Sequence, residues 1–302
     1  MPSPVHLPES TDFPAVVSAT TPVAVGGVGG SGTRLIAQCL MELGYFFGSD
    51  LNESNDNLLF TLLFKRIDIL ESSDGEFRQL LDIFCRRMLG GKDIATGQLA
   101  LASMLASEKR HKLSVAWLED RVLALREVEM NGYSKSESRN WGWKEPSTHV
   151  VLDRLLKNIP RMKYIHVVRN GLDMAYSENQ NQLAWWGGYF LGGEIELSPR
   201  NSLRYWCAVH KRVLNIGESM GANFLLLNYD EFCTDPEGGI ELLCDFLAVN
   251  DDRAAIQSQL LGLIDTPNSM GRYKNRDISA FDKKDVEYVE QLGFDTTQSF
   301  TR

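Results

Sequence analysis

The chain has 302 residues, of which 43% are hydrophobic and 24% charged, and these proportions exclude wholesale disorder and the collagen-like and mucin-like classes. Its 40 acidic residues outnumber 31 basic ones and give a formal net charge of −9, which argues against a dedicated nucleic-acid or membrane-surface protein. An anion bound by this protein must therefore be held by a local concentration of positive charge.

The sequence shows no signal for export or for insertion into a membrane. No run of about 18 apolar residues occurs, so we expect no membrane span. No Lys or Arg precedes Arg34, so the basic start of a secretory signal is missing. The five cysteines form no CxxC pair and have no zinc-like spacing with histidine, which favours reduced core thiols and no metal site. We expect a cytoplasmic protein; the sequence gives no indication of its oligomeric state.

In chain order, the sequence predicts a flexible tail over residues 1–20 and one α/β domain over residues 21–302. The tail contains four prolines and no periodic pattern. Short apolar runs typical of buried parallel strands then alternate with helical patterns. A helical insert covers about residues 57–130. The strand-like runs are Pro22–Gly26, Tyr45–Phe47, Trp141–Lys144, Tyr164–Val168 and Asn223–Leu227. This alternation predicts a central, mostly parallel sheet flanked by helices on both faces.

A glycine-rich loop joins the first predicted strand to the first predicted helix. It runs through Gly29, Gly30, Ser31 and Gly32 to Thr33, which opens the helix. Glycines allow backbone N–H groups to turn inward, and a helix start carries a partial positive charge, so the loop favours a phosphate-like anion. A plain tight turn is the alternative, but such a turn does not require so many glycines.

Three kinds of anion site fit this loop. The spacing Gly27-x-Gly29-x-x-Gly32, with Asp50 18 residues further on, matches a dinucleotide-binding fingerprint. A nucleotide P-loop would need lysine where Thr33 stands, so a kinase or ATPase is disfavoured. Ser-Gly-Thr after a strand resembles the 5′-phosphosulfate loop of sulfotransferases, which use 3′-phosphoadenosine 5′-phosphosulfate (PAPS). The loop alone leaves the choice open.

A second segment points to phosphate binding. The strand Tyr164–Val168 delivers Arg169 at its end, and Ser177 follows eight residues later on the next helix. A guanidinium and a hydroxyl so placed can hold one phosphate from two sides. Pairing of Arg169 with Asp173 is the alternative. The segment resembles the 3′-phosphate motif of sulfotransferases.

Two later segments extend the resemblance to the sulfotransferase family. The run Asn223–Pro236 resembles the family strand whose tyrosine contacts adenine, which implies that role for Tyr229. The run Ser269–Lys274 resembles the basic loop that closes over the 3′-phosphate, which implies donor-binding roles for Arg272, Tyr273 and Lys274. The four segments occur in family order over roughly residues 21–275. The resemblance implies a three-layer, P-loop-like fold, closest in motif style to bacterial and tyrosylprotein sulfotransferases.

Lys144 is the predicted catalytic cation. With Pro146 two residues later, it resembles the Lys-x-Pro element of tyrosylprotein and many bacterial sulfotransferases, which implies contact with the bridging oxygen of PAPS. An ordinary surface lysine is the alternative. Cytosolic sulfotransferases have a histidine where this chain has Pro146, so that base is absent here.

The general base is left open among three residues. Tyrosylprotein sulfotransferases use a glutamate after the second strand, and the matching region here is residues 48–56. Glu53 has the longer reach and Asp50 the nearer spacing; His149 is a third choice. Each carboxylate could instead cap the helix that begins near Asn57.

One departure from the family lies in the donor loop. The family has lysine or arginine immediately before Ser-Gly-Thr, where this chain has Gly30. Arg34, or backbone amides together with Lys144, would then supply the missing charge.

The acceptor is expected to be a hydroxyl-bearing carbohydrate or other small molecule, by family analogy alone. The cluster Trp185–Phe190 could stack on sugar rings or lie in the core. We interpret the chain as a PAPS-dependent sulfotransferase without a metal. The alternatives are an NAD(P)-dependent oxidoreductase and a non-catalytic nucleotide-binding module.

Overall fold

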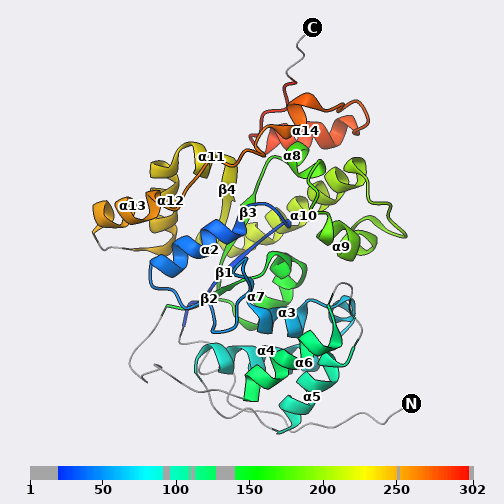
Figure 1. Cartoon of the computed structure of the whole chain (residues 1–302), viewed down its shortest axis with the longest axis vertical. Helices are drawn as coiled ribbons and strands as arrows, with labels where there is room; N and C mark the ends of the chain where they lie inside the picture. The colour runs from blue at the N-terminus through cyan, green and yellow to red at the C-terminus, as the bar shows by residue number, and fades with distance from the viewer. Residues whose placement is uncertain are drawn as a thin grey trace.

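The structure is a computed structural model that describes residues 20–90, 96–108, 110, 113–126, 140–249 and 252–298. Nearly all of the predicted tail over residues 1–20 lies outside these ranges. Within them, four strands form one parallel sheet in the order β2-β1-β3-β4 (Figure 1). The strands are β1 (Val23–Gly27), β2 (Gly142–Lys144), β3 (Lys163–Val168) and β4 (Phe224–Asn228). The predicted α/β class with a central parallel sheet is confirmed.

Helices cover both faces of the sheet, so the fold has three layers. Alternate residues of a strand point to opposite faces: Val23 and Val25 lie in one hydrophobic cluster and Ala24 in another. The first cluster includes residues of α2 (Thr33–Glu42), α11 (Tyr229–Thr234), α12 (Pro236–Leu247) and α13 (Arg253–Leu261). The second includes residues of α7 (Leu152–Asn158), α8 (Gly171–Ala175), α9 (Asn181–Leu191), α10 (Pro199–Met220) and α14 (Lys283–Gln291).

The segment of the predicted helical insert, residues 57–130, is helical wherever the structure describes it as an element. Figure 1 shows its helices gathered at one end of the molecule, next to the β2 end of the sheet. Aromatic rings join them to β2: Phe60 stacks on Trp143 at 5.7 Å between ring centroids, and Phe84 meets the same ring edge-on at 5.3 Å. The elements are α3 (Leu58–Phe64), η1 (Ile67–Leu70), α4 (Asp74–Met88), α5 (Thr96–Ala106) and α6 (Val115–Arg126). Residues 127–130 lie outside the described residues, and the division into one domain with an insert stays a prediction.

The predicted strand Tyr45–Phe47 is reduced to one parallel bridge between Phe46 and Trp141. Phe46 N–H donates to Asn140 O, and Phe46 O accepts from Gly142 N–H. Gly48 follows with φ 112°, a left-handed conformation that turns the chain away from β2. The apolar run is therefore buried at the edge of the sheet but is too short to form a strand.

The carboxyl ends of all four strands lie at the same edge, because the strands are parallel. Ligands of open α/β sheets bind outside this edge. The short elements η2 (Pro146–Val151), η3 (Gly221–Asn223) and η4 (Arg272–Asn275) complete the described secondary structure.

All five cysteines are buried with free thiols. Among the described helices, none has the length and apolar character needed to cross a bilayer.

Candidate active site

The glycine loop begins where β1 ends and finishes at the first residue of α2. Gly30 and Gly32 have φ values of 95° and 96°, which L-residues with side chains rarely adopt. Gly32 caps α2 without a side-chain hydrogen bond, so the first N–H groups of the helix have no capping oxygen from this residue. Ser31 Oγ is buried and has no hydrogen-bond partner in the described part of the chain. An amide-lined helix start with an unpaired hydroxyl suits an anion.

Two further predicted residues lie directly against this loop. A Cβ on Gly32 would stand 2.1 Å from the ring of Tyr229, which begins α11 at the end of β4. A Cβ on Gly30 would stand 3.8 Å from Ser177 Oγ, and Ser177 follows the end of α8 at Ala175 instead of lying on the helix as predicted. Residues after the ends of β3 and β4 thus lie against the loop that follows β1. Position 32 requires glycine because its φ is positive and because a Cβ would collide with the Tyr229 ring.

Arg169 stands at the end of β3, buried with 5% of its surface exposed. Its guanidinium carbon lies 5.7 Å from the centroid of the Tyr229 ring. Nη2 donates to Ser269 Oγ at 2.8 Å, and Nε lies 3.6 Å from Asp230 Oδ1. Burial raises the pKa of Asp230, and the nearby Arg169 charge opposes this rise. Arg169 therefore pairs with an acidic residue, but this residue is Asp230 and not Asp173, the partner considered from the sequence.

Asp173 instead fixes the loop over residues 269–274. Its two carboxylate oxygens accept from Gly271 N–H at 2.6 Å and from Tyr273 N–H at 3.0 Å. This loop carries Arg272 toward Arg169, and burial together with the Arg169 charge lowers the pKa of Arg272. Two guanidinium groups that repel each other in a partly buried position suit an anion.

The other two predicted residues of this loop are engaged elsewhere. The Tyr273 hydroxyl donates to Asp295 O at 2.8 Å, and Lys274 Nζ lies 3.0 Å from Asp295 Oδ2. These contacts attach the chain after α14 to the loop. Donor-binding roles for Tyr273 and Lys274 stay predictions.

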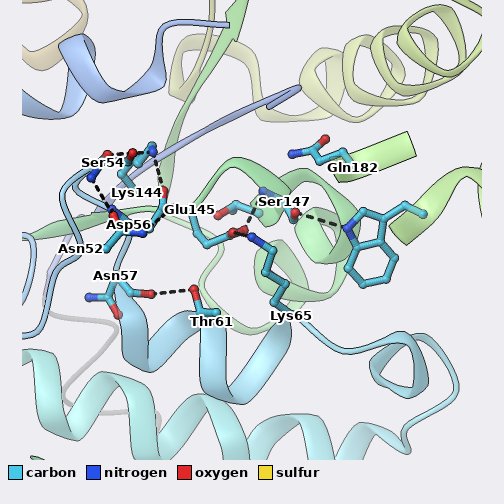
Figure 2. A network of polar contacts seen from close by, with 12 residues as sticks. Asn52, Ser54, Asp56, Asn57, Thr61, Lys65, Lys144, Glu145, Ser147 and Gln182 are labelled. Atoms are coloured by element: carbon cyan, nitrogen blue, oxygen red, sulfur yellow. Dashed lines mark hydrogen bonds and ion pairs between the residues drawn. The ribbon is translucent and has the colours of Figure 1, made fainter. Parts of the chain in front are cut away.

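Lys144 ends β2, the neighbour of β1, and only 2% of its surface is exposed. Nζ donates to Ser54 O at 2.9 Å and forms an ion pair with Asp56 (Figure 2). Asn52 Nδ2 donates to the other carboxylate oxygen of Asp56 at 2.9 Å. Lys144 is therefore a buried and paired lysine, unlike an ordinary surface lysine.

The carboxylate at Lys144 is not one of the residues predicted from the sequence. Glu53 is exposed in a turn, and Asp50 accepts from Arg121 Nη1 at 3.0 Å with its pKa raised by burial. His149 is fully buried, and burial lowers its pKa to about 3. Asp56 lies at the end of the region 48–56 that the family resemblance indicates, but spacing alone does not distinguish it from the other carboxylates.

Arg34 lies in the first turn of α2, and its Nη2 donates to Ser54 Oγ at 2.7 Å. Ser54 thus accepts from two cations, Arg34 through its side chain and Lys144 through its carbonyl. Both positive charges lie at the turn over residues 52–56. This places side-chain charge near the helix start although position 30 is glycine.

The residue after Lys144 anchors the chain that follows it. Glu145 is fully buried; one of its oxygens accepts from Ser147 N–H and the other from Lys65 Nζ, both at 2.6 Å (Figure 2). Burying a charged carboxylate is unfavourable unless a cation and hydrogen-bond donors contact it, as they do here. Glu145 therefore fixes the start of η2 beside the catalytic candidate.

Comparisons with known proteins identify the family of this chain. A model of the sulfotransferase family matches residues 22–253. The chain belongs to the sulfotransferase family. The matched region includes the glycine loop, Lys144, Arg169 and Tyr229 but ends before the loop over residues 269–274. The alternative of an NAD(P)-dependent oxidoreductase is not favoured, because the family model that matches is that of sulfotransferases.

Solved structures similar to this sulfotransferase have low sequence identity to it. The sulfotransferase domain from the curacin biosynthetic pathway is 16% identical with a TM-score of 0.52, over 91% of this chain and 98% of that domain. The sulfotransferase domain from the Synechococcus PCC 7002 olefin synthase is 17% identical with a TM-score of 0.49, over 91% and 96%. Sulfotransferase STF1 from Mycobacterium tuberculosis H37Rv is 15% identical with a TM-score of 0.39, over 79% and 71%. No curated protein matches the sequence.

A cleft of this sulfotransferase lies between the segment after the Phe46 bridge and the insert helices α4 and α6. It encloses about 410 Å³, solvent at its mouth included. Asp50, Asn57 and Arg121 line it together with apolar side chains such as Phe46 and Met88. The predicted aromatic cluster is divided: Trp186 is fully buried, whereas Tyr189 is 60% exposed.

The described residues of this sulfotransferase contain no group of three or more His, Cys, Asp or Glu side chains placed to hold a metal ion. The groups described above that could bind an anion are backbone N–H groups, the Ser31 hydroxyl and the side chains of lysine and arginine.

Proposed function

We propose that this protein transfers a sulfuryl group from PAPS to a hydroxyl of a carbohydrate or other small acceptor. One observation carries the proposal: the Tyr229 ring lies against Gly32 on the donor loop and 5.7 Å from the Arg169 guanidinium carbon. PAPS has an anionic group at each end of its adenosine, and an aromatic ring between two anion-binding groups suits such a molecule.

The residues present fit this donor. The loop amides other than that of Ser31, which donates to Val28 O, would hold the 5′-phosphosulfate together with the unpaired Ser31 hydroxyl. Arg169, Ser177 and Arg272 would hold the 3′-phosphate, and Tyr229 would contact the adenine. Burial, and after it the Arg169 charge, lower the pKa of Arg272, and one phosphate held between the two guanidinium groups would offset their repulsion.

In sulfuryl transfer, the acceptor oxygen forms a bond to sulfur while the bond from sulfur to the bridging phosphate oxygen breaks. Negative charge develops on the departing oxygen, and the hydroxyl proton passes to a base. Lys144 would stabilise the departing oxygen, with Arg34 as a second cation.

The base we propose first is Asp56, because its contact with Lys144 places a carboxylate beside the group that is transferred, where it could take the proton of the acceptor hydroxyl. Glu53 and Asp50, the residues indicated by spacing, remain the alternatives. Asp50 already accepts from Arg121, and Glu53 is exposed in the turn that Asp56 terminates.

Five buried, free thiols are consistent with a reducing compartment, so we also propose that the protein acts in the cytoplasm.

The experiment that tests the function combines binding with a transfer assay. Thermal unfolding is followed with 3′-phosphoadenosine 5′-phosphate (the bisphosphate), NAD or ATP, since a ligand that binds only the native state raises its stability. We expect stabilisation by the bisphosphate alone, and transfer of ³⁵S from PAPS to at least one member of an acceptor library. Stabilisation by NAD alone would contradict the proposal, and tight bisphosphate binding without transfer would indicate a non-catalytic module.

A further inference from the structure

Gln182, the second residue of α9, connects the glycine loop to the core beneath it. Its side chain is buried, with 6% of the residue exposed. Nε2 donates to Gly27 O at 3.0 Å. Oε1 lies 3.1 Å from His149 Nε2 and accepts from the Tyr205 hydroxyl at 3.3 Å. One amide therefore contacts three elements that are far apart in the sequence.

The direction of these hydrogen bonds follows from the partners. A carbonyl oxygen only accepts, so the NH₂ group of Gln182 must face Gly27 O, and Oε1 must face His149. His149 Nε2 then carries the proton that it donates to Oε1. Burial lowers the pKa of His149 to about 3, so the ring is neutral at neutral pH and this arrangement is fixed.

Gly27 is the last residue of β1, where the glycine loop begins. A peptide unit is planar, so holding Gly27 O also fixes the direction of the Val28 N–H group at the entry of the loop. The site leaves no space for a side chain here: a Cβ on Gly27 would lie 2.5 Å from Val167 O and 2.6 Å from Ser31 Oγ. The hydrogen bond from Gln182 Nε2 to Gly27 O therefore orients the peptide group between Gly27 and Val28.

The other end of the connection reaches the chain behind Lys144. His149 belongs to η2, which begins at Pro146, two residues after Lys144. Glu145 fixes the start of η2 through Ser147 N–H. Displacement of η2 would therefore shift the end of β2, where Lys144 stands.

We propose that Gln182 is a positioning residue for sulfuryl transfer. Its side chain keeps the glycine loop at a fixed position relative to η2, the segment that follows Lys144. The inference rests on the proposed function. The loop amides and the Lys144 ammonium must act together on one phosphosulfate group, and errors of about 1 Å in such placements cost about 10²-fold in rate.

Two substitutions separate this role from simple packing. Gln182→Met keeps the length of the side chain and removes all three hydrogen bonds. Gln182→Glu keeps both acceptor positions toward His149 and Tyr205 but removes the donor to Gly27 O. The matched control is Trp186→Phe on the same helix: Trp186 Nε1 donates to Ser147 Oγ at 3.3 Å and so contacts η2 without contacting the loop.

Calorimetric titration with the bisphosphate and with 5′-AMP, which lacks the 3′-phosphate, measures the effect. Both Gln182 variants are expected to bind each nucleotide about tenfold more weakly, the effect of about one lost hydrogen bond. The ratio between the two nucleotides is expected to stay within twofold of wild type, because Arg169 is untouched. Trp186→Phe is expected to lower the melting temperature while leaving both affinities within twofold.

Hydrogen exchange of the amides of Val28 to Ser31 gives a readout that needs no nucleotide. We expect faster exchange there in both Gln182 variants than in Trp186→Phe. Wild-type affinity and wild-type loop exchange in the folded Gln182→Glu protein would overturn the inference. If the wild-type protein itself binds no bisphosphate, the proposed function fails, and the exchange data alone then decide whether Gln182 orients the loop.

Discussion

Lys144 and Asp56 form an ion pair at the carboxyl edge of the sheet although 88 residues separate them in the sequence. The pair joins the end of β2 to the turn that precedes the insert helix α3, and Ser54 in that turn also binds Arg34 of α2. The turn over residues 52–56 therefore connects a cation beside the donor loop, a second cation and a carboxylate. A transferring group, its departing oxygen and an acceptor proton need these three charges in one place.

Replacement of Lys144 by alanine should slow transfer about 10²–10³-fold at saturating substrates, the cost of removing one charged donor from a developing oxyanion. The affinity for the bisphosphate should change little, because Arg169 and the loop amides remain. Steady-state kinetics with ³⁵S-labelled PAPS measures the rate and calorimetry the affinity. Unchanged turnover at saturation would remove Lys144 from the mechanism.

Asp56→Asn should lower turnover by about 10²–10⁴-fold, the usual contribution of a general base. The asparagine keeps the size and the contact with Lys144 but cannot take a proton. Glu53→Gln and Asp50→Asn are measured in parallel, and each should lose less activity than Asp56→Asn. A larger loss in either of them would transfer the base role to that residue.

Arg169→Ala should remove the preference for 3′-phosphorylated nucleotides, a loss of about 10–100-fold in the affinity ratio of the bisphosphate to 5′-AMP. Arg169→Lys should recover only part of this preference, since an ammonium lacks the forked donor geometry. Both ratios are measured by calorimetry. A preference that survives in the alanine variant would refute the 3′-phosphate assignment.

Gly32→Ala should lower the free energy of unfolding by roughly 2–4 kcal/mol, because the methyl group meets the Tyr229 ring in a backbone conformation that alanine disfavours. Gly29→Ala is the matched control: its Cβ would have no contact closer than 3.6 Å. Urea unfolding of both variants provides the comparison. Equal stability of the two would contradict the close packing of Tyr229 on the loop.

Acid should destabilise the protein through its buried histidines. Burial lowers the pKa of His149 to about 3 and of His210 to about 4, below the ordinary value of 6.5. Between these values the unfolded chain binds more protons than the folded one, so stability is complete above about pH 6.5 and falls as the pH drops toward 4, by about 1.4 kcal/mol per pH unit for each histidine. Urea unfolding at pH 7.0, 6.0 and 5.0 should show this fall, with a smaller slope in His210→Gln. An unchanged slope in that variant would show that His210 is not one of the groups responsible.

The sequence allowed the layout of the fold to be predicted, together with the residues that this layout brings to one edge of the sheet. Each of the four strands carries a short apolar run, and parallel strands must end at one edge, so the glycine loop, Lys144 and Arg169 could be placed together from their positions after these runs. Tyr45–Phe47 shows the limit: the run is apolar and buried, but Gly48 turns the chain after one bridge.

The residues that sequence reasoning missed depend on contacts between distant segments. Asp56 could not be separated from Asp50 and Glu53, because the path of the turn over residues 52–56 decides which carboxylate meets Lys144. Gln182 gave no signal, since an isolated glutamine in a helical pattern is ordinary until a backbone carbonyl 155 residues away is placed against it.

The central claim is tested most directly by a crystal structure of the protein with the bisphosphate bound. We predict that the 5′-phosphate lies on the amides of the glycine loop with Ser31 Oγ in hydrogen-bond contact, and the 3′-phosphate between Arg169 and Arg272 with the adenine against Tyr229. A bound nucleotide that occupies one of these two places and leaves the other without an anion would contradict the account.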